Sequence, residues 1–154
     1  MVDDNFDGDR VSTATFHFEV DGLEIGSFMQ VSGLQVEVGV ENVEEGGENG
    51  FVHHLPGRMT WPNIVLKRGV TQTDALFTWL NKSSGEQFTS SGNKLTRSTA
   101  AITLIGPAGK RLRAWEFVDA FPVKWSGPEF AAESTDAATE QLEIAHHGFK
   151  AKDL

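Results

Sequence analysis

Residues 13–20 read TATFHFEV, and apolar and polar side chains alternate along them without interruption. A period of two is typical of a β-strand with one face buried and the other in water. Asp21-Gly22 follows, a pair that favours the tight turn of a β-hairpin. Residues 23–33, LEIGSFMQVSG, predict the returning strand, with Gly26 at a candidate bulge. In the first strand we expect Ala14, Phe16, Phe18 and Val20 on one face and Thr13, Thr15, His17 and Glu19 on the other.

The same alternation extends over much of the chain. In residues 34–41, LQVEVGVE, the apolar residues share one face, and the polar residues and glycine share the other. Residues 59–69, MTWPNIVLKRG, predict a strand with Ile64 and Leu66 facing inward. Pro62 has no amide proton to donate, so we expect it near a strand start or at a sheet edge. Further strands are predicted at residues 98–106 and 111–120, which flank the turn PAGK, at residues 121–125 and at residues 139–149.

One helix is predicted over residues 71–83, within TQTDALFTWLNKSSG. Thr71 or Thr73 is placed to cap it, and Asp74 suits its first turn. Its apolar stripe consists of Ala75, Leu76, Phe77, Trp79 and Leu80, spaced as on one face of a helix. The pattern therefore predicts a mainly β protein with seven or eight strands and one helix.

Length and composition predict a single domain over residues 1–154, with enough apolar residues (39%) to bury a core. The net charge is -9, from 22 acidic and 13 basic residues, and the basic residues are scattered. Specific nucleic-acid binding is disfavoured, because it needs clustered lysine and arginine. Cysteine is absent, which excludes disulfides, thiolate metal sites and thiol nucleophiles.

The first ten residues, MVDDNFDGDR, are acidic and lack the basic start and apolar run of a signal peptide. We expect residues 1–11 to be flexible. No apolar stretch approaches the roughly 20 residues that a membrane-spanning helix needs. The sequence predicts a protein that is made in the cytoplasm, carries no membrane anchor and bypasses the general secretory route if it is exported.

Residues 44–58, EEGGENGFVHHLPGR, contain the residue types of a metal or phosphate site. Adjacent residues on a strand point to opposite faces, so neither His53 and His54 nor His146 and His147 can share one ion from a regular strand. The glycines match neither of the nucleotide-binding patterns GxxxxGK[ST] and GxGxxG, and the glutamates would repel phosphate. The calcium pattern of an EF-hand is missing as well. We expect no cofactor and no metal.

Catalytic motifs are also missing from the sequence. No GxSxG elbow is present, and no pair of carboxylates has the spacing of a recognisable acid and base, so we expect a protein that is not an enzyme. Strands with one polar and one apolar face suit a sheet that lies on a core and faces water. They suit equally a barrel that identical subunits complete around a wet lumen.

Five stretches of the chain, in this order, resemble the inner tail-tube proteins of contractile injection systems. This family includes the tail tubes of contractile phages and the tubes of phage-tail-like extracellular particles. Each stretch alone is a weak signal, but the ordered set spans residues 13–149 and is specific. The stretches are FHFEVDGLEIGSFMQVSGL, EEGGENGFVHHLPGRMTWPNIVLKRG, WLN, RAWEFVDAFPVKWSGPEF and EQLEIAHHGF.

The resemblance implies two packed antiparallel sheets that form a small barrel or sandwich, with one flanking helix and a long projecting loop. It also implies hexameric rings whose inner strands merge into one continuous β-barrel. Such rings stack into a hollow tube inside a contractile sheath, which drives the tube through a target envelope to deliver cargo. The implied partners are further copies of the chain, the sheath protein, baseplate or spike proteins, tube-terminator proteins and a cargo effector in the lumen.

The resemblance assigns a ring-stacking role to the loop of residues 41–58. A glycine-rich segment can become ordered on the neighbouring ring, where its apolar side chains bury surface. Arg58, Lys67 and Arg68 are candidate basic partners for the loop glutamates of another ring. The predicted contact residues are Glu44, Glu45, Gly46, Gly47, Glu48, Phe51, His53, His54, Leu55, Pro56 and Arg58.

Glu19 and Glu37 are candidate lumen residues, since a lumen coated with carboxylates would let DNA or acidic cargo slide rather than adhere. The resembling tubes occur in particles that stay inside the producing cell, in released particles and in virions. Two alternatives to an injection-system tube stay open at this point. One is the tail tube of a contractile phage, which conducts DNA, and the other is a monomeric ligand-binding β-barrel with a closed apolar cavity.

Overall fold

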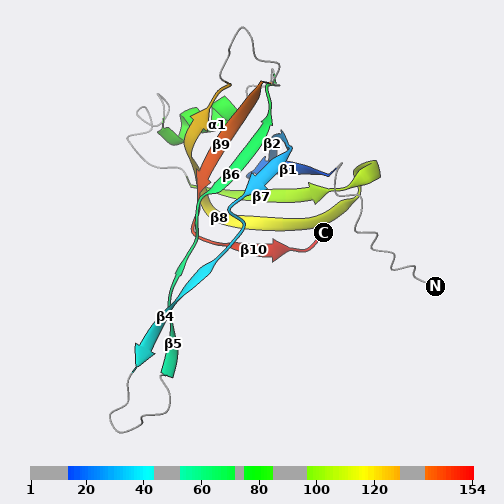
Figure 1. The fold of residues 1–154 in the computed structure, drawn as a ribbon. Coiled ribbons are helices and arrows are strands. Elements are labelled where there is room, and N and C mark those ends of the chain that lie inside the picture. The colour runs from blue at the N-terminus through cyan, green and yellow to red at the C-terminus, as the bar shows by residue number, and fades with distance from the viewer. Residues whose placement is uncertain (1–13, 44–52, 72–74, 85–96, 129–137) are drawn as a thin grey trace, which may run out of the picture.

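The computed structural model describes residues 14–43, 53–71, 75–84, 97–128 and 138–154 (Figure 1). The region of residues 1–11, which we expect to be flexible, lies outside this part of the chain. The described residues form one α-helix, a short 3-10 turn and ten strands. These elements are β1 (Thr15–Val20), β2 (Leu23–Phe28), β3 (Gln30–Ser32), β4 (Glu37–Val43), β5 (His53–Thr60), β6 (Ile64–Gly69), α1 (Ala75–Ser84), β7 (Ser98–Ile105), the 3-10 turn (Pro107–Gly109), β8 (Arg111–Ser126), β9 (Thr139–Ala145) and β10 (Phe149–Lys152).

The long strand β8 belongs to two sheets and joins them. Its first part pairs with β7 on one side and with β10 on the other, and its last part pairs with β9. The first sheet therefore has the order β2-β1-β7-β8-β10, and the second has the order β8-β9-β6-β3. All pairings are antiparallel. The predicted mainly β fold with antiparallel sheets and one helix is confirmed.

β8 bends at Val118 and Asp119, just before its pairing with β7 ends at Ala120 and its pairing with β9 begins at Phe121. Asp119 has a positive φ of 52°, and Val118 exchanges backbone hydrogen bonds with His147 and Gly148, at 2.8 and 3.0 Å. β2 of the first sheet and β3 of the second are separated by Met29 alone, whose amide donates to the carbonyl of Lys67 at 2.8 Å. β2 and β3, the two ends of the strand order β2-β1-β7-β8-β9-β6-β3, are therefore consecutive in the chain. They are not paired with each other, so the strands do not close into a barrel within the described residues.

The core lies between the two sheets, and α1 packs against β2 and β8 beside it. In α1, Leu76 and Trp79 are buried, and the Trp79 ring lies 5.6 Å from that of Phe18. Full burial of a large apolar side chain stabilises a fold by about 1.5–3 kcal/mol. The largest fully buried side chains come from both sheets and the helix: Phe18, Phe28, Ile64, Leu66, Leu76, Ile102, Phe117 and Leu142.

Several predicted elements agree with the structure. Phe18 and Val20 are buried on β1, and Asp21-Gly22 forms the turn to β2 with a positive φ at both residues. Ile64 and Leu66 face inward as predicted. The hairpin of β7 and β8 encloses the predicted turn PAGK.

Other predicted boundaries differ from the structure because strands bend or end where the alternation continues. The strand expected at residues 34–41 covers Glu37–Val43 instead, and the one expected at 59–69 is interrupted at Trp61–Asn63. Residues 111–125 belong to one strand, whereas the last predicted strand is divided into β9 and β10. The helix is described from Ala75; of its predicted first-turn residues, Thr71 is described ahead of the helix, and Thr73 and Asp74 lie outside the described residues.

Candidate assembly surface

β4 and β5 form a two-stranded antiparallel hairpin, called the arm below, that projects away from both sheets (Figure 1). Glu37 lies opposite Thr60 at its base, and Val43 lies opposite His53 at the far end of the described strands. Neither strand pairs with a third strand in the described part of the chain. A lone two-stranded hairpin is only marginally stable in water, so the arm lacks the support that each body strand receives.

The large apolar side chains of the arm are exposed. Val38 is 46% exposed and Val40 is 62% exposed, and Leu55 and Met59 are about half exposed. Val38 lies opposite Met59, and Val40 lies opposite Pro56, so apolar side chains stand next to one another across the hairpin. Contiguous apolar surface of this kind marks a contact site.

The two histidines of the arm occupy neighbouring positions on β5. His53 lies opposite Val43, and His54 lies opposite Asn42. Adjacent residues on a strand point to opposite faces, so the arm presents its histidines to two different surfaces. The described residues contain no group of three or more His, Asp or Glu side chains placed to hold a metal ion.

Part of the predicted ring-stacking loop is strand. Residues 41–43 belong to β4 and residues 53–58 to β5, although Pro56 and Gly57 are residues that strands usually disfavour. The predicted contact residues His53, His54, Leu55, Pro56 and Arg58 therefore lie on β5. The other predicted contact residues lie outside the described residues: Glu44, Glu45, Gly46, Gly47, Glu48 and Phe51.

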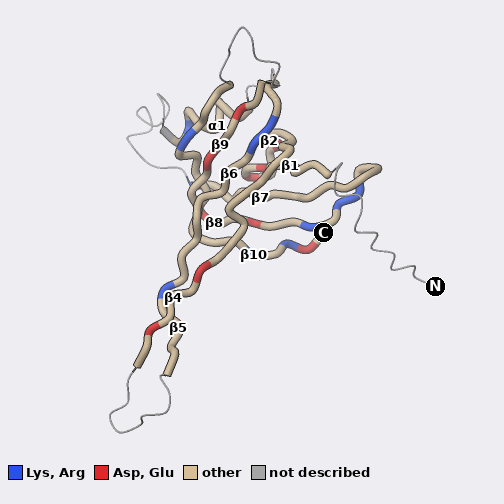
Figure 2. Tube along the Cα trace, viewed as in Figure 1, with Lys and Arg blue, Asp and Glu red and all other residues tan. Residues whose placement is uncertain are grey.

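Charged side chains on the arm are few (Figure 2). Glu37 and Glu41 lie on β4 and Arg58 lies on β5, all of them exposed. Lys67 lies on β6 in the body, is partly exposed and stands opposite a glutamine on each neighbouring strand. Arg58 and Lys67 thus remain candidate partners for acidic residues of another copy.

Arg68, the third candidate, requires a correction. Its side chain is 3% exposed, forms a buried ion pair with Glu140 of β9 and lies over the ring of Phe28 at 4.9 Å. A Cβ atom at Gly26 would collide with this guanidinium, so glycine makes room for it. Arg68 is committed to the core of its own subunit and offers no surface to a neighbouring loop.

The two candidate lumen residues lie in different parts of the molecule. Glu19 is on β1 in the first sheet, where its Oε1 atom lies 3.3 Å from Nε2 of His17. Glu37 is at the base of the arm. The described structure of one subunit does not bring the two carboxylates together, and a lumen-facing position for either stays a prediction.

A pocket of about 430 Å³ lies between α1 and the hairpin of β1 and β2. Its lining is mainly apolar and includes Val20, Leu23, Ile25 and Trp79. Leu23 is strongly exposed at its rim, so the pocket opens to the surface. It differs from the closed cavity inside a barrel that a ligand-carrying β-barrel would need.

Two packed antiparallel sheets, one helix and a projecting hairpin with half-exposed apolar side chains define the class of fold. A family model described as the T4-like virus tail tube protein gp19 matches residues 12–150. The chain therefore belongs to this tail tube family, and the resemblance to tail-tube proteins is confirmed. A comparison with curated proteins found no match.

Solved structures of related assemblies contain chains with this fold. A chain of the PVC sheath-tube complex, from an extracellular contractile injection system in its extended state, is 26% identical, with a TM-score of 0.72 over 90% of this chain and 88% of that chain. A chain of the tube-terminating cap of the anti-feeding prophage is 24% identical, with the same TM-score and coverage, and shows the shared fold. A type six secretion system protein has a TM-score of 0.55 at 10% identity over 89% of this chain and 82% of that chain, which likewise concerns the fold alone.

In the part of the chain that the structure describes, no helix combines the length and the apolar character needed to cross a bilayer.

Proposed function

We propose that this chain is the inner tube subunit of a bacterial contractile injection particle. Copies form hexameric rings, the rings stack into a hollow tube, and contraction of a surrounding sheath drives the tube through a target envelope to deliver cargo. The proposal is supported by membership of the tail tube family and by the similarity to a chain of a sheath-tube complex. The structural observation that carries it is the arm, whose large apolar side chains on the described strands are about half exposed.

The arm is the proposed contact between stacked rings. Valine and methionine side chains that are about half exposed would gain about 25 cal/mol for each Å² of apolar surface removed from water. Every copy of the chain has the same exposed apolar side chains on its arm. Contact between two copies therefore removes apolar surface of both from water. The predicted contact residues from Glu44 to Arg58 belong to this proposal, including those outside the described residues. Their glutamates would meet Arg58 or Lys67 of the next copy.

The second sheet offers strand edges suited to closing a ring. Its outer strands are β3 and the last part of β8, and neither has a further strand partner among the described residues. They run in opposite directions, so copies placed side by side would continue the sheet in the antiparallel manner. The outer strands of the first sheet, β2 and β10, run in the same direction and would meet in parallel. We propose that the second sheet contributes to the continuous inner β-barrel.

The proposed partners follow from the assemblies in which similar chains occur. A sheath protein, baseplate or spike proteins and a tube terminator would contact the tube from outside or at its ends, and a cargo effector would occupy the lumen. The subunit would be assembled in the bacterial cytoplasm, within a particle that is retained or released. Its role is structural and not enzymatic.

A contractile-phage tail tube is the second candidate function, favoured by the description of the matching family as a virus tail tube. The two functions predict different neighbours in the genome. Capsid and terminase genes would indicate a phage, whereas a AAA ATPase gene and toxin genes without capsid genes would indicate an injection particle.

Electron microscopy of the purified full-length chain tests the proposed function. We expect rings or tubes for the wild type and none for Val40→Glu, because a carboxylate on the arm would have to be desolvated in the stacked state. The same substitution at Leu112, an exposed apolar residue on β8, is the matched control and should still give tubes. A wild-type chain that stays monomeric at every concentration would overturn the proposed function. Tubes from Val40→Glu would overturn the role of the arm alone.

A further inference from the structure

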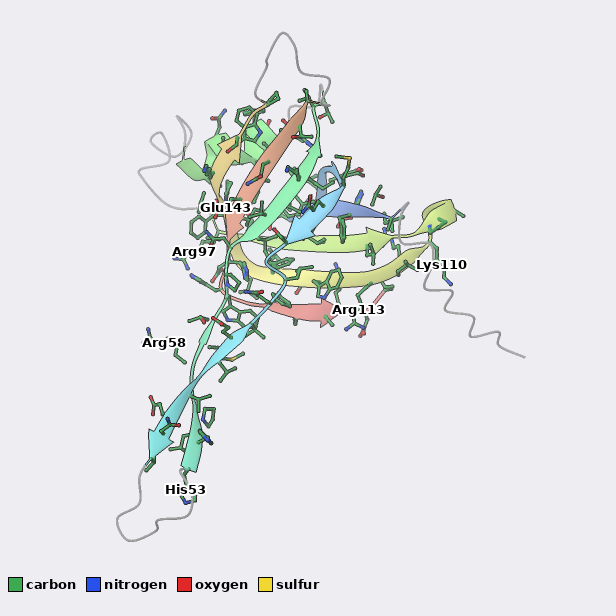
Figure 3. All side chains as sticks on the ribbon, viewed as in Figure 1. His53, Arg58, Arg97, Lys110, Arg113 and Glu143 are labelled. Atoms are coloured by element: carbon green, nitrogen blue, oxygen red, sulfur yellow. The ribbon has the colours of Figure 1, made fainter. Side chains whose placement is uncertain are left out.

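The arm is connected to the body at two places, through Gly33–Val36 between β3 and β4 and through Trp61–Asn63, called the joint below, between β5 and β6 (Figure 1). A second bend, His146–Gly148, connects β9 with β10 and lies against the joint. Figure 3 shows Arg58 on the arm side of this region and Glu143 and Arg97 on the body side. The direction of the arm relative to the body therefore depends on how these two bends are held together.

The ring of His146 links the two bends through Nε2 and stabilises its own bend through Nδ1. Nε2–H donates to the carbonyl of Pro62 at 3.0 Å, and Nδ1 accepts from the amide of Gly148 at 3.0 Å. This arrangement needs the neutral ring with its proton on Nε2, since Nδ1 must keep its lone pair. Burial lowers the pKa of His146, which keeps the ring in this neutral form. One buried side chain thus bridges the start of β6 and the end of β9.

Aromatic packing holds the joint against the same bend. The ring of Trp61 lies 5.1 Å from that of Phe149 and 6.2 Å from that of His146, both edge to face. Gly148 has a φ of 117°, and a Cβ atom there would lie 3.2 Å from the Trp61 indole. Glycine therefore permits both the bend of the chain and the close approach of the tryptophan.

The joint has one more tie to the body. Nδ2 of Asn63 donates to Oε1 of Glu143 on β9 at 3.1 Å. Three consecutive residues, Trp61, Pro62 and Asn63, are thus each fixed to residues 143–149 through a different kind of contact. From this geometry we infer that His146 is a positioning residue, which holds the arm in the direction needed to contact a second copy of the chain. The inference rests on the proposed function.

The adjacent histidine provides a natural contrast. His147 is exposed, and its Nδ1 atom lies 3.1 Å from Oδ2 of Asp119 and 3.0 Å from Nη1 of Arg97. These two contacts join it to Arg97 and to β8 and not to the joint. Two histidines that are indistinguishable in the sequence HHG thus differ in what they hold, and only His146 contacts the joint.

The test compares His146→Phe with His147→Phe in the full chain. Phenylalanine at position 146 keeps an aromatic ring of similar size but removes both hydrogen bonds. His146→Gln, which retains a donor and an acceptor, is the rescue variant. Because the chain has no cysteine, two spin labels can be attached through Glu41→Cys on the arm and Arg113→Cys on the body. Labelled chains are diluted into unlabelled chains so that only distances within one subunit are measured.

We expect His146→Phe to broaden the distribution of arm-to-body distances and to raise the concentration needed for tube formation about tenfold, the equivalent of one lost buried hydrogen bond. His147→Phe should change neither, and His146→Gln should restore both in part. Should His146→Phe fail to fold, Asn63→Ala tests the same inference, since it removes the second tie at an exposed position. A distance distribution that matches the wild type in both variants would overturn the inference.

The distance measurement also separates this inference from the proposed function. It reports on a single subunit and does not require tubes. A wild-type chain with a narrow distance distribution that never assembles would retain the positioning role of His146 but contradict the tube function. A wild-type chain that forms tubes but has a broad distribution of arm-to-body distances would support the tube function and contradict the positioning role of His146.

Discussion

β6 and β4 carry the same kind of alternation but differ completely in what covers them. On β6, Ile64 is 1% exposed and Leu66 is fully buried, whereas Val38 and Val40 on β4 are about half exposed. The two strands are close in the chain, since only β5 lies between them. The difference teaches that alternation determines strand formation, while the surface that an apolar face meets is determined by tertiary and quaternary contacts.

The two regions also differ in how they use charge. The body buries an ion pair between Arg68 and Glu140, whereas the arm keeps Glu37, Glu41 and Arg58 in water. Charges on an exposed hairpin cost little free energy of folding and are free to meet a partner. Charges inside the body must be compensated within the subunit. The body is thus built to be self-sufficient, and the arm is not.

The largest effect is expected when the buried ion pair between Arg68 and Glu140 is broken. Glu140→Ala should lower the free energy of unfolding by about 3–5 kcal/mol, because it leaves the buried guanidinium of Arg68 without a partner. Urea unfolding of the purified subunit measures the change.

The double variant Arg68→Met with Glu140→Leu is the control for this prediction. It removes both charges and should be clearly more stable than Glu140→Ala alone. If Glu140→Ala unfolds at the wild-type urea concentration, the body does not depend on this pair.

A pair of truncations compares the two regions directly. Leu66→Ala should lower the free energy of unfolding by about 2–5 kcal/mol, because it creates a cavity in the core. Val40→Ala should lower it by only about 0.5 kcal/mol or less, since the side chain is largely in water. Thermal unfolding monitored by circular dichroism gives both values.

In tube formation we expect the reverse order, with a larger effect of Val40→Ala than of Leu66→Ala, provided that both variants remain folded. Val40→Ala should impair assembly more than its effect on unfolding suggests, because most of its side chain is exposed in one subunit and would be covered only by a second copy. Equal losses of unfolding free energy in Leu66→Ala and Val40→Ala would mean that the arm is part of the body and not a separate contact.

The smallest effect is expected from pH, at the joint between the two regions. Burial lowers the pKa of His146 below its usual 6.5, so the unfolded chain binds more protons than the folded chain between 6.5 and the lowered value. The stabilisation that comes from the neutral ring is present above pH 6.5 and is lost as the pH falls through this window. Melting temperatures measured between about pH 7.5 and about pH 5.5 should therefore fall more for the wild type than for His146→Gln.

The groups around His146 make this comparison interpretable. The titratable group whose charge acts on His146 is His147, which contacts Asp119 and Arg97, and Glu143 accepts a hydrogen bond from Asn63 of the joint. All of them are retained in His146→Gln, so the difference between the two pH profiles reports on His146. Parallel profiles would contradict a role for its neutral form.

Much of the body could be predicted from the sequence because its strands alternate regularly. The inward positions of Phe18, Ile64 and Leu66 follow from a period of two alone. The same period of two also places two polar residues on inward faces. Arg68 is two residues after Leu66, and His146 is two residues after Ile144, so both belong to inward faces.

The bends and the arm could not be derived in this way. A bend such as that at Asp119 depends on backbone hydrogen bonds to a distant segment, which no local pattern reveals. The sequence of the arm predicts a loop because Pro56 and Gly57, residues that strands usually disfavour, lie within β5. Its role as a projecting contact was predicted from the family resemblance, and its lack of cover became visible only from the described structure.

The passage of β8 through both sheets has a consequence for how the molecule opens. Neither sheet can separate from the core without breaking backbone hydrogen bonds of a strand that the other sheet also uses. Local opening of one sheet is therefore suppressed, and the amide protons of both sheets should exchange with solvent through the same global event. The arm, which shares no strand with them, is free to exchange by its own, much easier opening. A single subunit thus combines a cooperative unit, the two sheets, with a nearly independent unit, the arm. In a tube, we expect the arm to open cooperatively with the rest once neighbouring copies cover it.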